Sequence, residues 1–261
     1  MKPHLLVLCL AVWPVAWGHC ADLATDAGID GRLGQALPMD DAFVDQRGRP
    51  VTLRDVATGT PLVIAPVYFN CPNLCDAQLA TLFMTLDNSG YRPGRDYQLV
   101  AFSFNSDERP ADARAKLAEL ARRWPDLAQS PAVHFLTGPG PSSQSLSQAL
   151  GFHYRRDDTS GQYAHSSAIA TVTRDGHLSR WLYGLGYQGN DVRLAITEAG
   201  QGRVGSVKDR LLLLCAHFDP RTGGYDDRVL TLLRTAGVLT CVLIAGGIAL
   251  ALRRERKVAK S

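Results

Sequence analysis

A short apolar run that leads directly into two cysteines limits the possible folds of this chain more than any other feature. Residues 62–69 (LVIAPVYF) are apolar, β-branched and aromatic, which is typical of a buried strand. Asn70 and then Cys71, Pro72 and Cys75 follow, and an amphipathic segment begins at once. Because Pro72 suits the first turn of a helix, we expect both thiols at a strand-to-helix junction. The positive end of the helix dipole is expected to favour thiolates there.

The spacing of the two cysteines narrows their chemistry. Cys71 and Cys75 are expected one helical turn apart, with Cβ atoms separated by roughly 5–6 Å. A disulfide needs about 3.8 Å between Cβ atoms, so a bridge would distort the first turn of the helix. A metal held between the sulfurs tolerates the wider gap more easily. A structural disulfide or two packed thiols are the alternatives.

The first 20 residues have the pattern of an export signal. Lys2 supplies the positive charge, residues 5–16 form the apolar stretch, and residues 16–18 (AWG) offer a small-x-small cleavage site. We therefore expect residues 1–20 to be a signal peptide. Two alternatives stay open: a lipidated N-terminus at Cys20, and a short anchor that is not cleaved.

An uncharged stretch near the other end is long enough to cross a bilayer. It covers residues 235–252, after Arg234 and before the basic cluster RRERK at 253–257. Because basic residues mark the cytoplasmic side, we expect a single transmembrane helix at 234–252 and a cytoplasmic tail at 253–261. The body of the protein is then expected outside the cytoplasm, in the periplasm, anchored to the inner membrane. A buried globular helix is the alternative.

This compartment sharpens the question of what the cysteines do. Outside the cytoplasm, a dithiol is disulfide-bonded, kept reduced deliberately, or bound to metal, because cytosolic reductants do not protect it. The exported body keeps Cys71, Cys75 and Cys215. The other three of the six cysteines lie in the signal, at the cleavage region and in the span: Cys9, Cys20 and Cys241.

Composition points to one ordinary globular domain. Of 261 residues, 46% are hydrophobic and 20% are charged, and the part between the terminal segments is long enough for a real core. The net charge of +3 is small and dispersed, which argues against a nucleic-acid-binding protein.

Strand and helix patterns alternate along the central part of the chain. After a flexible leader at 21–40 and a hairpin at 43–53, they predict an α/β domain at 41–205 and a juxtamembrane segment at 206–233. The expected fold is a thioredoxin-like mixed sheet with helices on both faces. The expected strands are 62–69, 97–104, 133–136, 166–173 and 178–183, and the expected helices are the cysteine helix to about 86, then 111–123, 142–150 and 191–199.

Several short motifs together resemble the Sco/SenC family, membrane-tethered proteins that assemble copper into cytochrome c oxidase. The resemblance covers roughly residues 40–200 and is to the bacterial type with a C-terminal anchor. The motifs are YFNCPNLC at 68–75, SFN at 103–105 followed by RP at 109–110, FLTG at 135–138, and YAHS at 163–166 followed by Gly176 and YG at 183–184.

The resemblance implies a copper site made of Cys71, Cys75 and His165. Two soft thiolates suit Cu(I), and an imidazole lets the same site accept Cu(II). In a thioredoxin-like fold, the loop before the closing hairpin lies beside the active cysteines, and His165 falls there. The alternative is a histidine that only packs at the start of a strand. The rival histidines elsewhere in the domain are His134, His153 and His177.

One position departs from the family pattern. Many members carry Asp-Pro after the strand that ends here at Ser103-Phe104, whereas this chain has Asn105 and Ser106. The missing carboxylate puts metal affinity and redox role in doubt, and Asp107 is a weak candidate to replace it.

A second group of metal-ligand residue types lies just before the expected span. If the segment is extended, Cys215, His217 and Asp219 share one face, as metal ligands would. The alternative is an amphipathic lead-in to the membrane in which Cys215 is buried.

Two functions follow as hypotheses. The first is a periplasmic copper chaperone, rather than an enzyme, that passes copper to the binuclear copper subunit of a respiratory oxidase. The second is a thiol–disulfide reductase that keeps the copper-binding cysteines of that subunit reduced, with Cys71 attacking and Cys75 resolving. A peroxidase of the same fold is a distant third, because no Thr lies between Asn70 and Asp76.

Overall fold

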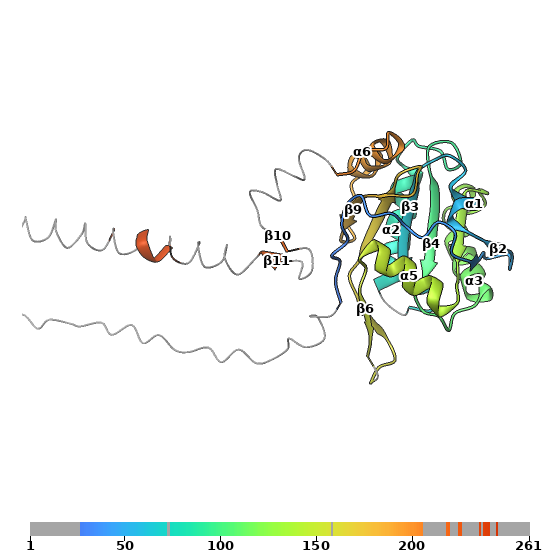
Figure 1. The fold of residues 1–261 in the computed structure, drawn as a ribbon, viewed down its shortest axis with the longest axis horizontal. Coiled ribbons are helices and arrows are strands. Elements are labelled where there is room, and N and C mark those ends of the chain that lie inside the picture. Colours follow the sequence, from blue (N-terminus) through green and yellow to red (C-terminus); the bar gives the residue numbers. More distant parts are fainter. Residues whose placement is uncertain are drawn as a thin grey trace, which may run out of the picture.

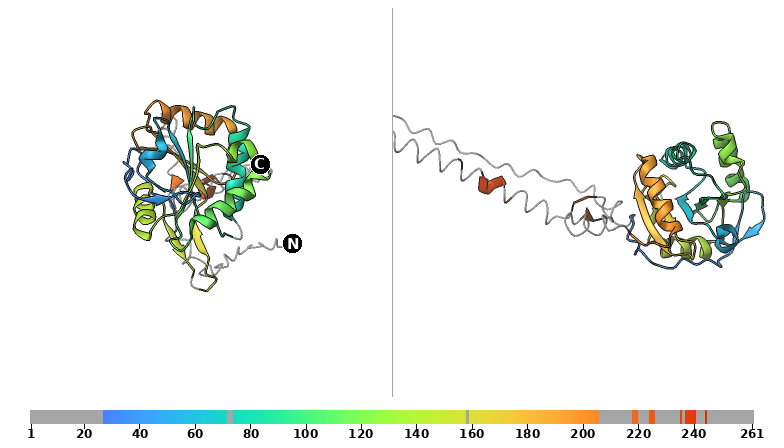
Figure 2. Two further views of the ribbon diagram at one scale, coloured as in Figure 1. Left: turned by 90° about the vertical axis from the view of Figure 1, so that its right-hand side faces the viewer. Right: turned by 90° about the horizontal axis from the view of Figure 1, so that it is seen from above.

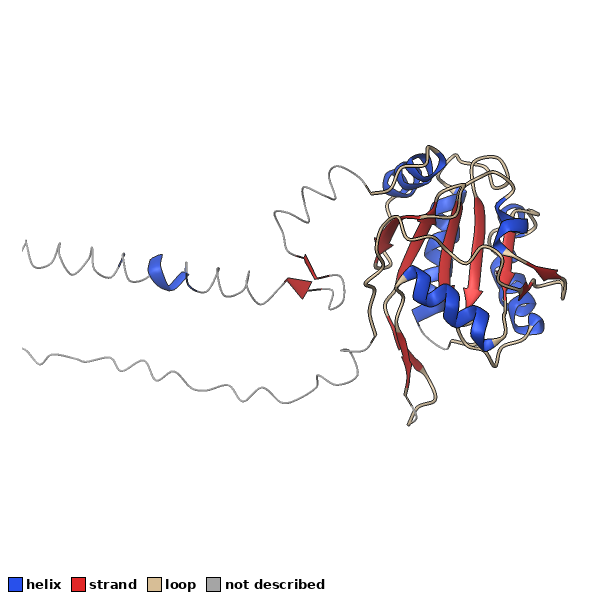
Figure 3. Cartoon of the chain, in the orientation of Figure 1, coloured by secondary structure: helices blue, strands red, loops and turns tan. Residues whose placement is uncertain are grey.

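A five-stranded mixed sheet forms the centre of the computed structural model, which describes residues 27–71, 74–157 and 159–205 with a few short stretches beyond them (218–219, 224–225, 235, 237–240 and 244). The strand order is β5-β4-β3-β8-β9 (Figures 1 and 3). Strands β3, β4 and β5 are parallel, whereas β8 is antiparallel to β3 and β9 to β8. The strands are β3 (Leu62–Val67), β4 (Gln98–Ser103), β5 (Val133–Leu136), β8 (Ala168–Val172) and β9 (Leu178–Tyr183).

Helices cover both faces of this sheet (Figure 2). Helix α2 (Leu74–Asp87) connects β3 to β4, and α3 (Pro110–Ala121) leads from β4 toward β5. Since both crossovers step across the sheet in the same direction, the right-handed rule puts both helices on one face. Helix α5 (Gly140–Leu150) belongs to the return from β5 to β8 and lies on the opposite face. Helix α6 (Gly189–Gly200) packs on α2, β8 and β9. The expected thioredoxin-like arrangement is confirmed.

The strand that carries the cysteines is wholly buried, as its composition predicts. Every residue of β3 is buried, because β4 and β8 flank it and helices cover it. Pro66 has no N–H to donate, yet it stands inside this central strand. The pairing of β3 with β8 ends at Ile64, and Pro66 pairs only with Phe102 of β4. The proline therefore lies beyond the point where β3 pairs with β8.

Several short elements are absent from the sequence prediction. Strands β1 (Phe43–Val44) and β2 (Pro50–Val51) form the expected hairpin, but Leu53 begins a helix, α1 (Leu53–Ala57), because Thr52 caps it in a capping box with Asp55. Helix α4 (Pro125–Ala128) follows Trp124, where the sequence predicts only a stop.

A second hairpin, β6 (Tyr154–Arg156) with β7 (Tyr163–His165), projects from the body of the domain (Figure 1). The sequence analysis expected a loop before β8. The hairpin is instead a regular antiparallel ladder in which Tyr154 faces His165 and Arg156 faces Tyr163. His165 is the last residue of β7.

The N-terminal segment is packed onto the domain over residues 27–40. Ile29, Leu37 and Met39 belong to the hydrophobic core, and Ile29 forms a β-bridge with Phe152. The amide of Leu37 donates to the carbonyl of Gly176 at 2.8 Å. The structure therefore differs from the flexible leader expected at 21–40, because every few residues an apolar side chain fills the core.

Some expectations fall outside the described residues. These are the signal peptide, Cys20, Cys215, His217, Cys241 and the basic tail. Asp219 lies in β10 (Phe218–Asp219), which pairs with β11 (Gly224–Tyr225). In the described part of the chain, none of the helices has the length and apolar character needed to cross a bilayer. Most of the expected span at 234–252 is not described.

Because the N-terminal segment is packed into the core, shortening one of its buried side chains should lower the free energy of unfolding strongly. Ile29 is fully buried, whereas Leu33 in the same segment is 39% exposed. Ile29→Ala should lower the free energy of unfolding by about 2–4 kcal/mol, because it leaves a cavity. Leu33→Ala should change it by about 0.5 kcal/mol or less. Urea titrations of both variants measure the difference, and equal small effects would mean that the segment is loose after all.

Candidate metal centre

The fold brings Cys75 and His165 into contact. Cys75 lies in the first turn of α2, just past the end of β3, and His165 ends β7 shortly before β8 begins. Since β8 runs antiparallel to β3, residues that precede β8 lie beside residues that follow β3. The Cys75 Sγ and the His165 Nε2 are 3.3 Å apart. The structure thus puts the imidazole beside Cys75, as the sequence analysis expected.

The orientation of the His165 ring identifies which nitrogen carries the proton. Its Nδ1 lies 3.0 Å from the carbonyl oxygen of Ser166. A carbonyl only accepts, so Nδ1–H donates to it. Burial lowers the pKa of His165, which favours the neutral ring. The lone pair of Nε2 therefore faces the Cys75 sulfur, as in metal-binding histidines that donate their other N–H to a carbonyl.

Cys71 faces the start of the same helix. Its Sγ accepts a hydrogen bond from the Cys75 amide at 3.5 Å, and the Tyr68 hydroxyl also hydrogen-bonds its side chain. Both cysteines are buried, and no disulfide joins them in this structure. Their proximity at a strand-to-helix junction agrees with the sequence analysis.

The expected preference for thiolate at the helix terminus is wrong for Cys75. Burial raises the pKa of this thiol, and the neighbouring Cys71 and Asp76 raise it further. The helix dipole acts within the first turn with a strength of about 0.3–1 kcal/mol at exposed sites. Loss of water around a fully buried sulfur disfavours the charged form more strongly. Cys75 is therefore a protonated thiol that can donate to the imidazole.

Aromatic rings enclose the imidazole. The centroid of the His165 ring lies 5.1 Å from that of Phe104, 6.0 Å from that of Phe152 and 6.1 Å from that of Tyr68. Tyr163 extends this shell, packing edge-on against Tyr68. Tyr68, Phe104 and Tyr163 lie in the family motifs, whereas Phe152 lies in none of them. These rings hold the plane of the imidazole, which stays partly exposed.

The donors fit a soft metal, although they are not closed around one. Among the described residues, no group of three or more His, Cys, Asp and Glu side chains is gathered as a metal cluster. The Cys75–His165 pair is nearest to that state. Sulfur and nitrogen on one tetrahedral metal, at about 2.3 and 2.0–2.1 Å from it, stand about 3.6 Å apart, close to the 3.3 Å observed. Two thiols and one imidazole are donors that copper prefers.

The three rival histidines lie elsewhere. His134 is in β5, two strands away from β3. His153 has its Nε2 at 2.6 Å from a carboxylate oxygen of Asp30, and His177 has its Nδ1 at 3.0 Å from a carboxylate oxygen of Asp175. None of them is a partner of the cysteines.

The acidic residue that binds the backbone of the cysteine loop is Glu108. The sequence analysis named Asp107 as the weak substitute for the family's carboxylate, but Asp107 is exposed, and its amide donates to Asn105 at 3.1 Å. Asn105 in turn accepts a hydrogen bond from the Tyr163 hydroxyl at 3.2 Å. Glu108 is buried and contacts the backbone just before Cys71. No sequence signal links these two segments.

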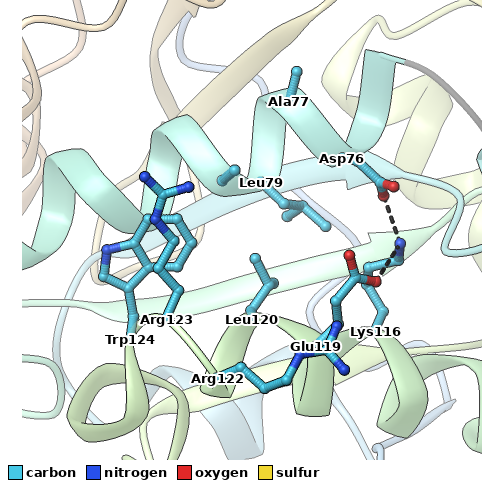
Figure 4. Close-up of a pocket in the computed structure, with 10 residues that line it drawn as sticks. Asp76, Ala77, Leu79, Lys116, Glu119, Leu120, Arg122, Arg123 and Trp124 are labelled. Atoms are coloured by element: carbon cyan, nitrogen blue, oxygen red, sulfur yellow. Dashed lines mark hydrogen bonds and ion pairs between the residues drawn. The ribbon is translucent and has the colours of Figure 1, made fainter.

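A groove of about 490 Å³ runs between α2 and α3 next to this site (Figure 4). Lys116 bridges the carboxylates of Asp76 and Glu119 inside it, and the Arg123 guanidinium lies 5.1 Å from the centroid of the Trp124 ring. The side chains that line the groove include none of the three donors. It is a feature of the surface beside the donors rather than a part of them.

Comparison with known families supports a single assignment. The sequence model of the SCO1/SenC family matches residues 32–192, which is more than half of the chain and includes the three residues expected as donors, Cys71, Cys75 and His165. The chain belongs to the SCO1/SenC family. A comparison with curated protein sequences finds no match.

Solved structures show the same fold at low sequence identity. A candidate electron transfer protein of Aquifex aeolicus is 18% identical, with a TM-score of 0.60, over 68% of this chain and 98% of that chain. Arabidopsis thaliana ScoI with copper bound is 15% identical, with a TM-score of 0.51, over 66% of this chain and 99% of that one. BsSco, described as a member of the Sco family of cytochrome c oxidase assembly proteins, is 18% identical, with a TM-score of 0.50, over 64% and 96%.

The partial burial of His134 predicts how the stability of this SCO1/SenC protein depends on pH. Burial lowers the pKa of His134 to about 4, below the roughly 6.5 of an unfolded histidine. Below pH ~6.5 the unfolded chain binds a proton that the folded chain does not, so stability falls as the pH drops and levels off near 4.

Replacing His134 should therefore reduce the loss of stability at low pH. The parent should lose up to about 1.4 kcal/mol of unfolding free energy per pH unit from this one site, and His134→Gln should lose less. Denaturant titrations at pH 7.5, 6 and 5 measure this, with the pH 7.5 difference as the baseline. A parent-to-variant difference that stays constant over this range would contradict the buried neutral histidine.

Proposed function

We propose that this protein is a copper chaperone that holds copper through Cys71, Cys75 and His165 and passes it to the binuclear copper subunit of a cytochrome c oxidase. The observation that carries the proposal is the 3.3 Å contact between the Cys75 Sγ and the unprotonated Nε2 of His165. Membership of the SCO1/SenC family supports it. So does the copper in the structure of Arabidopsis thaliana ScoI, which has the same fold.

Each donor has a separate task in this proposal. His165 presents a neutral nitrogen that needs no deprotonation, because the Ser166 carbonyl already holds its other N–H. Cys71 and Cys75 lose their protons when they bind the cargo ion. The packed aromatic rings hold the plane of the imidazole while the ion is bound. Transfer then proceeds by exchange, as thiol and imidazole donors of the recipient replace these three one at a time.

A membrane anchor is part of the proposal. An exported domain held by a helix at 234–252 would lie on the same side of the same membrane as an oxidase copper subunit. Tethering both partners to one surface raises their effective concentration. The anchor, the signal peptide and the periplasmic location rest on the hydropathy and charge pattern of the sequence.

The alternative of a thiol–disulfide reductase receives less support from the site. Such an enzyme needs an attacking thiol whose pKa is lowered, and that role falls to Cys71, so the raised pKa of the resolving thiol Cys75 does not count against it. What a reductase leaves unexplained is the imidazole, because the fold directs the Nε2 of His165 at the Cys75 sulfur and a reductase gives that contact no necessary role. A reductase would keep its biological activity in a His165 variant and lose it in Cys75→Ser.

Removing the imidazole tests the donor set. His165→Ala in the anaerobically purified full chain should lower copper affinity by more than about 100-fold, because even changes outside the ligand sphere cost 10–100-fold. The control is His153→Ala, which removes a half-exposed histidine bound to Asp30. Circular dichroism should show both variants folded. Unchanged copper stoichiometry in His165→Ala would overturn the assignment.

Copper loading should also release protons. Because the pKa of Cys75 is raised, its thiol is protonated at neutral pH and must give up that proton to bind metal. We expect at least about one proton per copper, measured by titration in weakly buffered solution at pH 7 with the metal-free, reduced protein. Copper uptake without proton release would mean that the thiolates exist beforehand, contrary to the effect of burial.

A further inference from the structure

A buried carboxylate joins the segment after β4 to the loop that carries Cys71. Glu108 is 6% exposed and stands two residues before α3 begins. Its Oε2 accepts from the Phe69 amide at 2.7 Å and from the Ser103 hydroxyl at 2.6 Å. Its Oε1 accepts from the Asn70 amide at 2.7 Å. One side chain thus holds two successive amides immediately before the cysteine.

The same loop is held at a second point. The side chain of Asn70 hydrogen-bonds the carboxylate of Asp112, in the first turn of α3. The Cys71 amide donates to the carbonyl of Tyr68 at 3.3 Å, which closes a tight turn over these residues. The position of the Cys71 sulfur therefore depends on contacts from a segment almost 40 positions away in the sequence.

We propose that Glu108 is a positioning residue for the copper site: its carboxylate fixes the Phe69 and Asn70 amides and so sets where the Cys71 thiol stands relative to Cys75. The inference rests on the proposed function, which it deepens by naming what orients one of the donors. Glu108 is not one of the three proposed donors; it acts through the backbone of the loop.

The bonding pattern explains why only a carboxylate serves here. Both oxygens accept from a backbone N–H, and neither amide can reverse its role. In Glu108→Gln, the amide NH₂ group must face either the Phe69 N–H or the Asn70 N–H. A donor then meets a donor, and one buried amide loses its partner. Glu108→Asp keeps two acceptor oxygens but withdraws them by one methylene.

The test compares the full chain with Glu108→Gln, Glu108→Asp and a destabilised control. Val56→Ala is the control, because Val56 is buried in α1, which precedes β3 and lies at the other end of that strand from Cys71. Two measurements are made under conditions in which every variant is folded. One is the rate at which iodoacetamide alkylates Cys71 in the metal-free protein, and the other is the Cu(I) affinity with the sulfur-to-copper absorption spectrum of the Cu(II) form.

A positioning role predicts a separation between the variants. In Glu108→Gln, iodoacetamide should alkylate Cys71 several-fold faster than in the parent. This variant should also bind copper about 10–100-fold more weakly, and its absorption spectrum should be shifted. Glu108→Asp should recover part of the affinity. Val56→Ala should resemble the parent in all three. If Glu108→Gln does not fold, Glu108→Asp carries the same comparison with smaller changes.

The outcomes separate this inference from the proposed function. If the parent binds no copper, the chaperone assignment fails, while the alkylation rates still decide the role of Glu108. If the parent binds copper and the Glu108 variants match Val56→Ala in alkylation rate, affinity and spectrum, Glu108 only stabilises the fold and the inference is overturned.

Discussion

The contact between the Cys75 sulfur and the Nε2 of His165 joins residues 90 positions apart, and the chemistry of the site depends on it. Two features of the fold create it. The antiparallel pairing of β8 with β3 brings the end of β7 beside the start of α2. The Ser166 carbonyl then fixes the ring so that its lone pair, rather than its N–H, faces the thiol. A neutral nitrogen and a soft sulfur side by side are the donor types that suit copper, and in the proposed site they need no rearrangement of protons on the ring.

Burial sets the protonation state of one of the two thiols. Phe104, Phe152 and Tyr68 pack around the imidazole, and burial keeps Cys75 protonated. A protonated thiol suits the resolving position of a reductase, and it also suits metal binding, because a metal ion readily displaces its proton. What favours the metal carrier is therefore the Nε2 of His165 directed at the Cys75 sulfur. The hydrogen bonds that Glu108 accepts stiffen the loop before Cys71. One side of the proposed donor set is then held by hydrogen bonds to the backbone, and the other by packed aromatic rings.

Much of the fold follows from local sequence patterns, whereas contacts between distant segments do not. The strands at 133–136 and 178–183 agree with β5 and β9, because their apolar runs end at clear turn residues. The β6–β7 hairpin was missed, since YRR and YAH carry little strand pattern. The burial of Ile29 and the hydrogen bonds of Glu108 depend on partners far along the chain. The three proposed donors were named from the family motifs. The thiolate expectation failed for Cys75, because the argument from the helix dipole takes no account of burial.

X-ray absorption at the copper edge tests the central claim most directly. The full chain, reduced and loaded with one equivalent of Cu(I) without oxygen, should show two sulfurs and one imidazole nitrogen bound to the metal. The imidazole is recognised by the scattering of its outer ring atoms. A spectrum with sulfur neighbours alone, or with light-atom neighbours and no sulfur, would contradict a site built on Cys71, Cys75 and His165.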